Sequence, residues 1–236
     1  ADKGLHRSAW DLRLPSPEPI NLTPEEDRPS WMPDPVGPMV LPGRYTARLA
    51  IEQDGMLQET GTPQAFTVKS LEVSPEITDD RRALQAFQLK VAGLQRAVAG
   101  SSAAIAELQN RIAHVRAAIV ATPSAGDAER DVLQQVATAL ADISVAISGD
   151  ATVSGRNEPA PMSIASRASS LYYNLVSSQS PAGGNYKDSY AAAAEEFAVA
   201  LRSLGRVESD LAALEQALEI KGAPWTPGRI PDWTDE

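Results

Sequence analysis

A chain of 236 residues with 43% apolar and 22% charged residues is long enough to bury a sizeable core in one domain or two. Its formal net charge of −10 argues against nucleic-acid backbones and anionic lipid surfaces as partners, because an acidic surface is repelled by both. The absence of cysteine excludes disulfides, thiolate nucleophiles and cysteine-ligated metal sites. Scarce aromatic residues and abundant alanine favour close-packed helices. No apolar run approaches the ~20 residues that span a bilayer, so membrane insertion is not expected.

Residues 1–76 are expected to form a proline-rich β-module. Nine of the 18 prolines lie in the first 42 residues, which excludes a helix there. The stretch 5–14 nevertheless has an extended pattern, with Trp10 and Leu12 on one face. A start without methionine suggests that the chain is an excised piece of a longer protein.

A period-two pattern begins after Gly43 and predicts a β-strand with Tyr45, Ala47, Leu49 and Ile51 on one face. The dipeptide Asp54-Gly55 then predicts a hairpin turn. Further strands are predicted at 57–60 and 64–73, separated by Gly61 and Pro63. With the extended stretch near the start of the chain, the prediction is a sheet of four short strands.

At Thr78-Asp79-Asp80 the period changes to that of a helix. The apolar positions alternate by three and four and keep their phase across Gly100 and Ser101, which predicts one continuous helix of about 43 residues and roughly 65 Å. A helical hairpin broken at 100–102 is the alternative. The predicted inward positions are Leu84, Phe87, Val91, Leu94, Val98, Ile105, Leu108, Ile112, Val115 and Ile119.

Three more helices are predicted before Gly222. The second starts at Asp127 and ends at Gly149-Asp150, a shorter third carries an apolar stripe over 164–175, and the fourth runs from about Asp188 to Lys221. A polar loop separates the second from the third, and short connections favour antiparallel neighbours. The predicted fold class is α+β, mainly α: an antiparallel bundle of about four helices over 77–222, the first very long, preceded by the small β-module. The inward positions predicted for the fourth helix are Tyr190, Ala194, Phe197, Leu201, Leu204, Leu211, Leu214 and Leu218.

The tail, 223–236, carries Trp225 and Trp233 among three prolines. Two large aromatic side chains are seldom left in solvent, so at least one is expected to pack back on the bundle or on the β-module. A disordered tail is the alternative.

No catalytic, cofactor-binding or metal-binding residue is predicted. His6 and His114 lie in unrelated settings, and His114 flanks the apolar seam of the long helix, as expected of a helix-surface histidine. The acidic runs at 25–27, 79–80 and 195–196 each have a structural explanation in a loop, a helix start or a solvent-facing helix surface. Gly183-Gly184 lacks the spacing of a phosphate-binding loop.

Two stretches are more specific than these: Gly4-Leu5-His6-Arg7-Ser8-Ala9-Trp10-Asp11-Leu12-Arg13, and the run from Gly37 to Leu49 that contains Pro42-Gly43-Arg44-Tyr45-Thr46. They resemble the end of bacterial sortilin-like, BNR-repeat "glycosyl hydrolase" proteins, in which a β-propeller is followed by an Ig-like module and a helical region. A weaker likeness extends over Ser163–Leu175 and Tyr186–Leu204. The motifs also look like the second half of the Ig-like module of the flagellar hook-cap type.

The resemblance implies an incomplete Ig-like module, an upstream β-propeller in the same polypeptide and a secreted or periplasmic location. It supplies no catalytic residue for this chain, and no cofactor. A sheet that lacks its first strands has an unpaired edge and an apolar face. That face is expected to be covered by Trp225 or Trp233, by the bundle or by another copy, so the candidate interaction residues are Trp10, Tyr45, Trp225 and Trp233.

The leading hypothesis for function is a non-catalytic accessory, interaction or scaffolding region of a larger secreted protein, with the β-module joining a propeller to a rigid helical arm. One alternative is a lid or wall of a sialidase-like glycosidase site on that propeller. Another is a self-associating coiled-coil module, forming a homo-oligomer through the β-edge or the helices.

Overall fold

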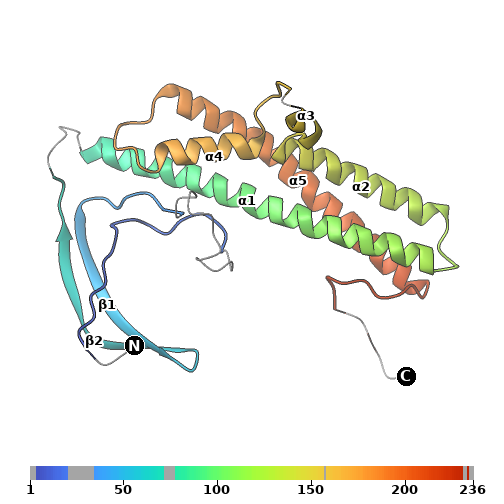
Figure 1. Ribbon diagram of the computed structural model, residues 1–236, viewed down its shortest axis with the longest axis horizontal. Helices are drawn as coiled ribbons and strands as arrows, with labels where there is room; N and C mark the ends of the chain where they lie inside the picture. The colour runs from blue at the N-terminus through green and yellow to red at the C-terminus, as the bar shows by residue number, and fades with distance from the viewer. Residues whose placement is uncertain (1–3, 21–34, 72–77, 157, 231–232, 234–236) are drawn as a thin grey trace.

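The computed structural model describes residues 4–20, 35–71, 78–156, 158–230 and 233, apart from the side chains of Thr78 and Asp79. A long helical bundle and a curved β-hairpin make up the fold, and the hairpin projects from one end of the bundle (Figure 1). The mainly helical α+β prediction is therefore confirmed. The acidic run at 25–27 and the last two residues of the predicted strand 64–73 lie outside the described residues.

The predicted long helix is one continuous element, α1, Thr78–Ala121. Gly100 is exposed, and Ser101 takes the buried position that an apolar residue holds elsewhere in the heptads. The unbroken phase of the apolar positions was therefore a reliable sign, and the predicted alternative of a break at 100–102 is wrong. All the predicted inward residues of this helix are buried except Phe87, which is half-buried.

Helix α2, Asp127–Ser148, returns along α1 after a short turn, and its first turn is closed by a hydrogen bond from the Gly126 amide to the Glu129 carboxylate at 2.7 Å. Its predicted stripe is buried at every position: Leu133, Val136, Leu140, Ile143 and Ile147. Helix α4, Ile164–Leu175, has its predicted stripe buried too and is capped by the Ser163 hydroxyl. Between them lies a single turn, α3, Ala151–Gly155, where a loop was predicted. The side chain of Asp150 accepts a hydrogen bond from the Thr152 amide and so starts this turn locally.

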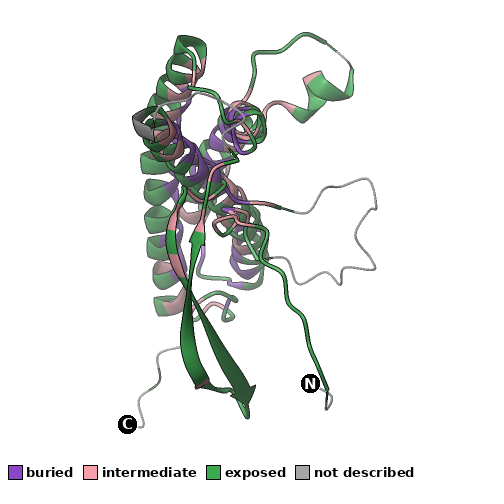
Figure 2. Cartoon of the chain, turned by 90° about the vertical axis from the view of Figure 1, so that its left-hand side faces the viewer, coloured by how far each residue is buried: buried purple, intermediate pink, exposed green. Residues whose placement is uncertain are grey.

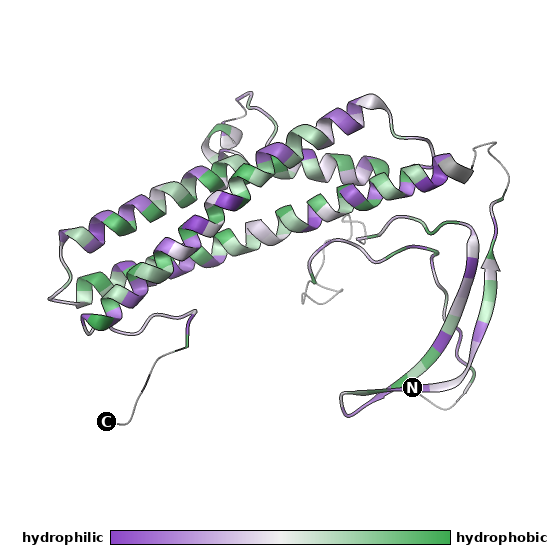
Figure 3. Ribbon diagram, turned by 180° about the vertical axis from the view of Figure 1, so that it is seen from behind, coloured by the Kyte–Doolittle hydropathy of each residue, from purple (hydrophilic) through white to green (hydrophobic). Residues whose placement is uncertain are grey.

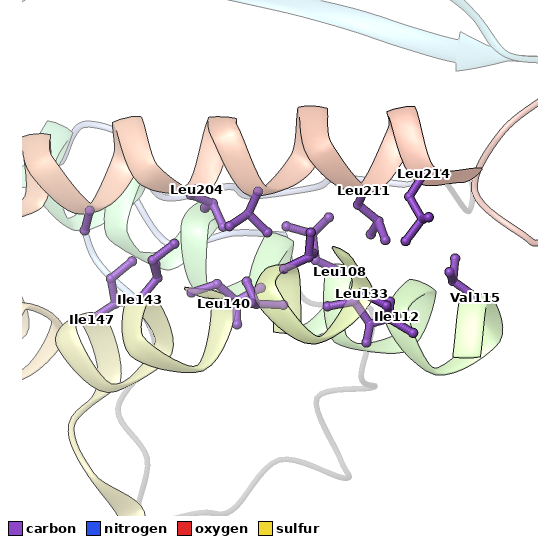
Figure 4. Close-up of a cluster of buried hydrophobic side chains, with 14 of the residues drawn as sticks. Leu108, Ile112, Val115, Leu133, Leu140, Ile143, Ile147, Leu204, Leu211 and Leu214 are labelled. Carbon is purple, nitrogen blue, oxygen red and sulfur yellow. The ribbon is translucent and has the colours of Figure 1, made fainter. Parts of the chain in front are cut away.

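The last helix, α5, Gly184–Ile220, runs parallel to α1, and α2 and α4 lie one after the other along both (Figure 1). Antiparallel neighbours are thus found for α1 with α2 and for α4 with α5. The four longer helices make a bundle of three rods, in which α2 and α4 share the third position. Leucine, isoleucine and valine side chains from α1, α2 and α5 interdigitate along its axis (Figure 4).

Two details of α5 differ from the prediction. The helix starts four residues earlier than Asp188, because the Gly183 carbonyl accepts hydrogen bonds from the amides of Tyr186 and Lys187. Leu201, predicted to face inward, is exposed, and Tyr190 and Ala194 are half-buried, whereas Ala193, Ala200 and Val207 are buried. The heptad phase of Val207 and Leu214 therefore continues back to Ala200 and Ala193. The prediction took the larger leucine at 201, which departs from that phase.

The β-module is a hairpin of two strands, β1, Gly43–Gln53, and β2, Met56–Val68. Asp54 and Gly55 both have positive φ, 53° and 75°, which confirms the predicted turn. The prediction of separate strands at 57–60 and 64–73 is wrong: β2 continues through Gly61 and Pro63 as a bulge. The stretch 5–14 forms no strand and contributes one bridge, from Arg13 to Met39.

Candidate interaction surface

One face of the hairpin carries apolar side chains and is open to solvent. The register places Tyr45 opposite Phe66, Leu49 opposite Thr60 and Ile51 opposite Gln58. Because paired residues share a face, the odd-numbered apolar residues of β1 lie together there, next to Trp10. We call Trp10, Tyr45, Leu49, Ile51 and Phe66 the hairpin face. Leu49 is 68% exposed and Ile51 57%, in contrast with the buried interior of the bundle (Figure 2).

The expectation that the bundle or a tail tryptophan covers this face is wrong for the chain by itself. Trp10 is 44% exposed. The tail that carries Trp225 leaves the bundle at the end far from the hairpin (Figure 1). To cover the hairpin face, the tail would have to run back along more than the length of α2. It cannot do so, because α5 ends at the opposite end of the bundle from the hairpin (Figure 1). Cover by another copy stays a prediction.

The base of the hairpin is held by an aromatic cluster. The Trp10 ring meets Tyr45 edge-on at 5.5 Å and Phe66 at 6.1 Å between centroids, and Tyr45 and Phe66 stack at 6.1 Å. Each such pair contributes about 0.5–1.5 kcal/mol beyond its buried area. The Tyr45 hydroxyl donates to the Leu41 carbonyl at 2.6 Å. Two of the predicted interaction residues, Trp10 and Tyr45, are thus brought together.

Below this cluster, the segment before β1 is docked on the helices. The Arg13 guanidinium donates to the Gly37 carbonyl at 2.8 Å and to the Val176 carbonyl, just after α4, at 3.4 Å. Gly37 is required here because a Cβ atom would lie 1.9 Å from the Leu14 carbonyl oxygen. Pro17 and Pro38 are fully buried. The proline-rich region therefore includes a packed joint.

Glutamine and tyrosine side chains of α1 and α4 complete this joint. Gln85 donates to the Met39 carbonyl at 2.8 Å, and buried Gln88 donates to the Leu175 carbonyl at 2.6 Å. The Tyr172 hydroxyl donates to the Val36 carbonyl, and burial raises the pKa of Tyr172 to about 12. Gln95 donates to the Glu18 carboxylate at 3.2 Å. We call Arg13, Gly37, Gln85, Gln88 and Tyr172 the clamp. The sequence did not predict the clamp. Its one sign in the sequence was the presence of polar residues, Gln85 and Gln88, beside the apolar positions of α1.

A groove of about 440 Å³ opens beside the clamp. Its walls come from the segment before β1, the end of β2, the start of α1 and the loop after α4, and Leu12, Val40, Val68 and Leu84 line it. Lys69 and Arg81 stand among its polar lining residues. The groove lies against the clamp, and its apolar lining adds to the apolar surface at the base of the hairpin.

At the other end of the molecule the tail is fastened to the bundle. Thr226 is buried, Ala223 packs on the main core, and Arg229 pairs with Glu219. Trp233 is exposed and Trp225 is half-exposed, so packing of a tail tryptophan on the bundle or on the β-module stays a prediction for Trp225. Neither residue approaches Trp10 or Tyr45.

A buried ion pair lies close to the tail. Arg111 of α1 donates to both carboxylate oxygens of Glu215 of α5, at 3.2 and 2.7 Å, and Glu215 is only 1% exposed. The hydrogen bond to Glu215 raises the pKa of Arg111. Gly228 of the tail lies directly over the Arg111 side chain. The sequence analysis missed this pair, although two opposite charges on inward helix faces could have indicated it.

Groups that could perform chemistry are scattered. His114 is exposed on α1, as predicted, and Glu195 and Glu196 face solvent on α5. Within the described ranges no group of three or more His, Asp or Glu side chains could hold a metal ion. Among the helices described, none is long and apolar enough to cross a membrane.

The fold and its surfaces define a class: a three-rod helical bundle with a clamped, uncovered β-hairpin (Figure 3). Comparison with protein-family models, with curated proteins and with solved structures finds no match.

Proposed function

We propose that this chain is a non-catalytic interaction or scaffolding region, which presents the hairpin face to a partner at a fixed orientation to a rigid helical arm. Two features found together support the proposal: the hairpin face is apolar and open to solvent, and the clamp fixes the hairpin to the helices. A free two-stranded hairpin is marginal in water, so the clamp and a partner on the open face would both stabilise it.

The wider context rests on the two sequence motifs alone. In the larger secreted protein that they suggest, the β-module would join an upstream β-propeller to the helical arm. The Ig-like character of the module belongs to the same proposal.

Rigid presentation is tested by distance measurements between spin labels. The chain has no cysteine, so Gln58→Cys on β2 and Ala212→Cys on α5 give two clean labelling sites, both exposed. The expected result is one narrow distance distribution. Adding Gly37→Ala should broaden it, because the new Cβ would force the segment before β1 away from Leu14. Gly93→Ala is the matched control, since an added Cβ there meets no atom within 4 Å.

A broad distribution in the parent chain would contradict the proposal, because a scaffold of this design needs a fixed joint. A narrow distribution that survives Gly37→Ala would remove the clamp as its cause.

A further inference from the structure

The two outer edges of the hairpin differ. Within the described residues, β1 and β2 pair only with each other, so each strand has one open edge. Between the Ala47–Gln64 and Leu49–Thr60 pairs, β2 carries the bulge, with Gly61 at a φ of 73°. Pro63 inside the bulge has no amide to donate. Bulges and prolines are the means by which proteins block an edge, so the β2 edge is protected.

The β1 edge has no such protection. β1 runs for 11 residues from Gly43 to Gln53 without proline, and none of its residues has positive φ. Every residue from Thr46 to Gln53 is exposed. A long, regular and exposed edge strand is a template for another strand.

The sequence of β1 is complementary to itself in the antiparallel direction. If two copies align so that Gly43 faces Gln53 of the other copy, all 11 residues pair and Arg48 lies on the twofold axis. Arg44 then lies opposite Glu52, which gives two opposite-charge pairs per dimer. On the other face of the sheet, Tyr45 lies opposite Ile51, an aromatic–β-branched pair, and Ala47 lies opposite Leu49.

Neighbouring registers lose these pairs. A shift of two residues places Arg44 opposite Ala50 in one direction and opposite Asp54 in the other, where Asp54 belongs to the turn. A shift of one residue would place the apolar face of one β1 strand on the same side of the sheet as the polar face of the other.

Charge also favours the hairpin over the bundle as a contact between copies. The hairpin carries two arginines, Arg44 and Arg48, against Glu52, Asp54 and Glu59, whereas the chain as a whole has a net charge of −10. The two Arg48 side chains at the axis are each compensated by Glu59 of the same hairpin, 3.1 Å away. Because the hairpin projects from the bundle, two copies can join there with their acidic helices apart (Figure 2).

We propose that the hairpin binds a second copy of the chain, through antiparallel pairing of the two β1 edges into a four-stranded sheet with the β1 strands at the centre. The inference rests on the proposed function in that it names a partner for the same hairpin, bound at its β1 edge, and the hairpin face then continues across both copies. A single strand pair with its flanking apolar side chains is a small interface, so the dimer is expected to be weak and concentration-dependent.

The charge pairs give a direct test by sedimentation of the full chain over micromolar to millimolar concentrations. Arg44→Glu and Glu52→Arg should each raise the dissociation constant about tenfold, because each replaces two attractive pairs with repulsive ones. An equimolar mixture of the two variants should dimerise as the parent does, since its mixed dimer restores both pairs. Failure of the mixture to recover would overturn the proposed register.

Apolar pairing across the two β1 strands is tested with two lysine substitutions on the same face. Leu49→Lys should weaken the dimer by up to about tenfold, because it removes both apolar cross-strand pairs between Leu49 and Ala47 of the other copy. Met56→Lys is the control, because Met56 is similarly exposed, at 74% against 68%, and lies on β2, paired with Gln53 and away from the β1 edge. Equal effects of the two changes would contradict the proposal.

A cysteine scan locates the axis even for a weak dimer. Because the chain has no cysteine, Arg48→Cys introduces one thiol, and two such thiols would face each other across the twofold axis within disulfide reach. Oxidative cross-linking should peak at residue 48 and be low for Thr67→Cys on β2. A chain that stays monomeric and does not cross-link at 48 would overturn the second-copy proposal and point to a partner of different sequence. A narrow spin-label distance would still support the scaffold in that case.

Discussion

In the bundle, Leu211 of α5 exposes none of its side chain, whereas Leu49 of β1 exposes 68%. The two residues have the same chemistry and opposite environments. The bundle buries its apolar stripes within one chain, because three rods can surround each leucine. The hairpin has an equally regular stripe and only one layer, so its apolar face has no second layer to pack on. The difference teaches that amphipathic patterning indicates which face will be buried but not which molecule buries it.

A first prediction tests this contrast at the two leucines. Leu211→Ala should lower the free energy of unfolding by about 2–5 kcal/mol through lost burial and a residual cavity. Leu49→Ala should change it by less than about 0.5 kcal/mol at low micromolar concentration, where the proposed weak dimer would be dissociated. Urea unfolding followed by far-ultraviolet circular dichroism measures both. A large loss for Leu49→Ala would mean that the hairpin face is covered within the chain.

The two ion pairs sharpen the same contrast. Arg111→Met should cost about 3–5 kcal/mol, because it leaves the carboxylate of Glu215 buried and uncompensated. The double change Arg111→Met with Glu215→Leu should recover most of that loss. Arg48→Met is the matched control in the hairpin: its pair with Glu59 is exposed at both ends, so the change should cost less than about 1 kcal/mol.

Thermal unfolding of these three variants checks the prediction. If the double variant were as unstable as Arg111→Met alone, packing of the arginine stem rather than charge burial would explain the loss.

The smallest effect concerns the far end of the bundle, where α2 begins. Hydrogen bonds from Lys221 and from the Gly126 amide lower the pKa of Glu129 to about 2. A depressed carboxylate pKa stabilises the fold above the unfolded value, near 4.5, and that contribution is lost as the pH falls from about 4.5 through about 2. Glu129→Gln should therefore lower Tm at neutral pH, and its difference from the parent should vanish towards pH 2.

Differential scanning calorimetry across this pH range measures that difference. A gap in Tm that is constant with pH would show that the amide itself, and not the lost charge, disturbs the start of α2.

The long helix α1 and helix α2 could be predicted from the sequence almost to the residue, because their ends depend on local signals, whereas α3 was predicted as a loop and α5 begins four residues before its predicted start. The phase of Val98, Ile105 and their neighbours was enough to carry α1 across Gly100 and to bury Ser101. Proline and glycine marked the ends. Where the prediction was wrong, at Leu201, it preferred a leucine to an alanine, although the heptad phase of Val207 and Leu214 leads to Ala200.

The β-module and the candidate site were less accessible to sequence reasoning. The alternation from Tyr45 to Ile51 and the turn at Asp54-Gly55 were predicted, because both are local. The bulge at Gly61 was predicted as the end of a strand, because glycine and proline are found both at bulges and at strand ends. The clamp depends on side chains such as Arg13 and Gln88, which meet carbonyl groups far away in the chain.

The sequence by itself therefore determined the four longer helices, most of their inward stripes and the hairpin turn, because each is written in residues close together along the chain. The tertiary structure alone decided that α2 and α4 share one position, that Arg111 and Glu215 meet, that Gly37 closes a joint and that the hairpin face stays open. These outcomes depend on packing between segments distant in the sequence, where the free energy of contact is set by shape and by distances that a residue pattern does not contain.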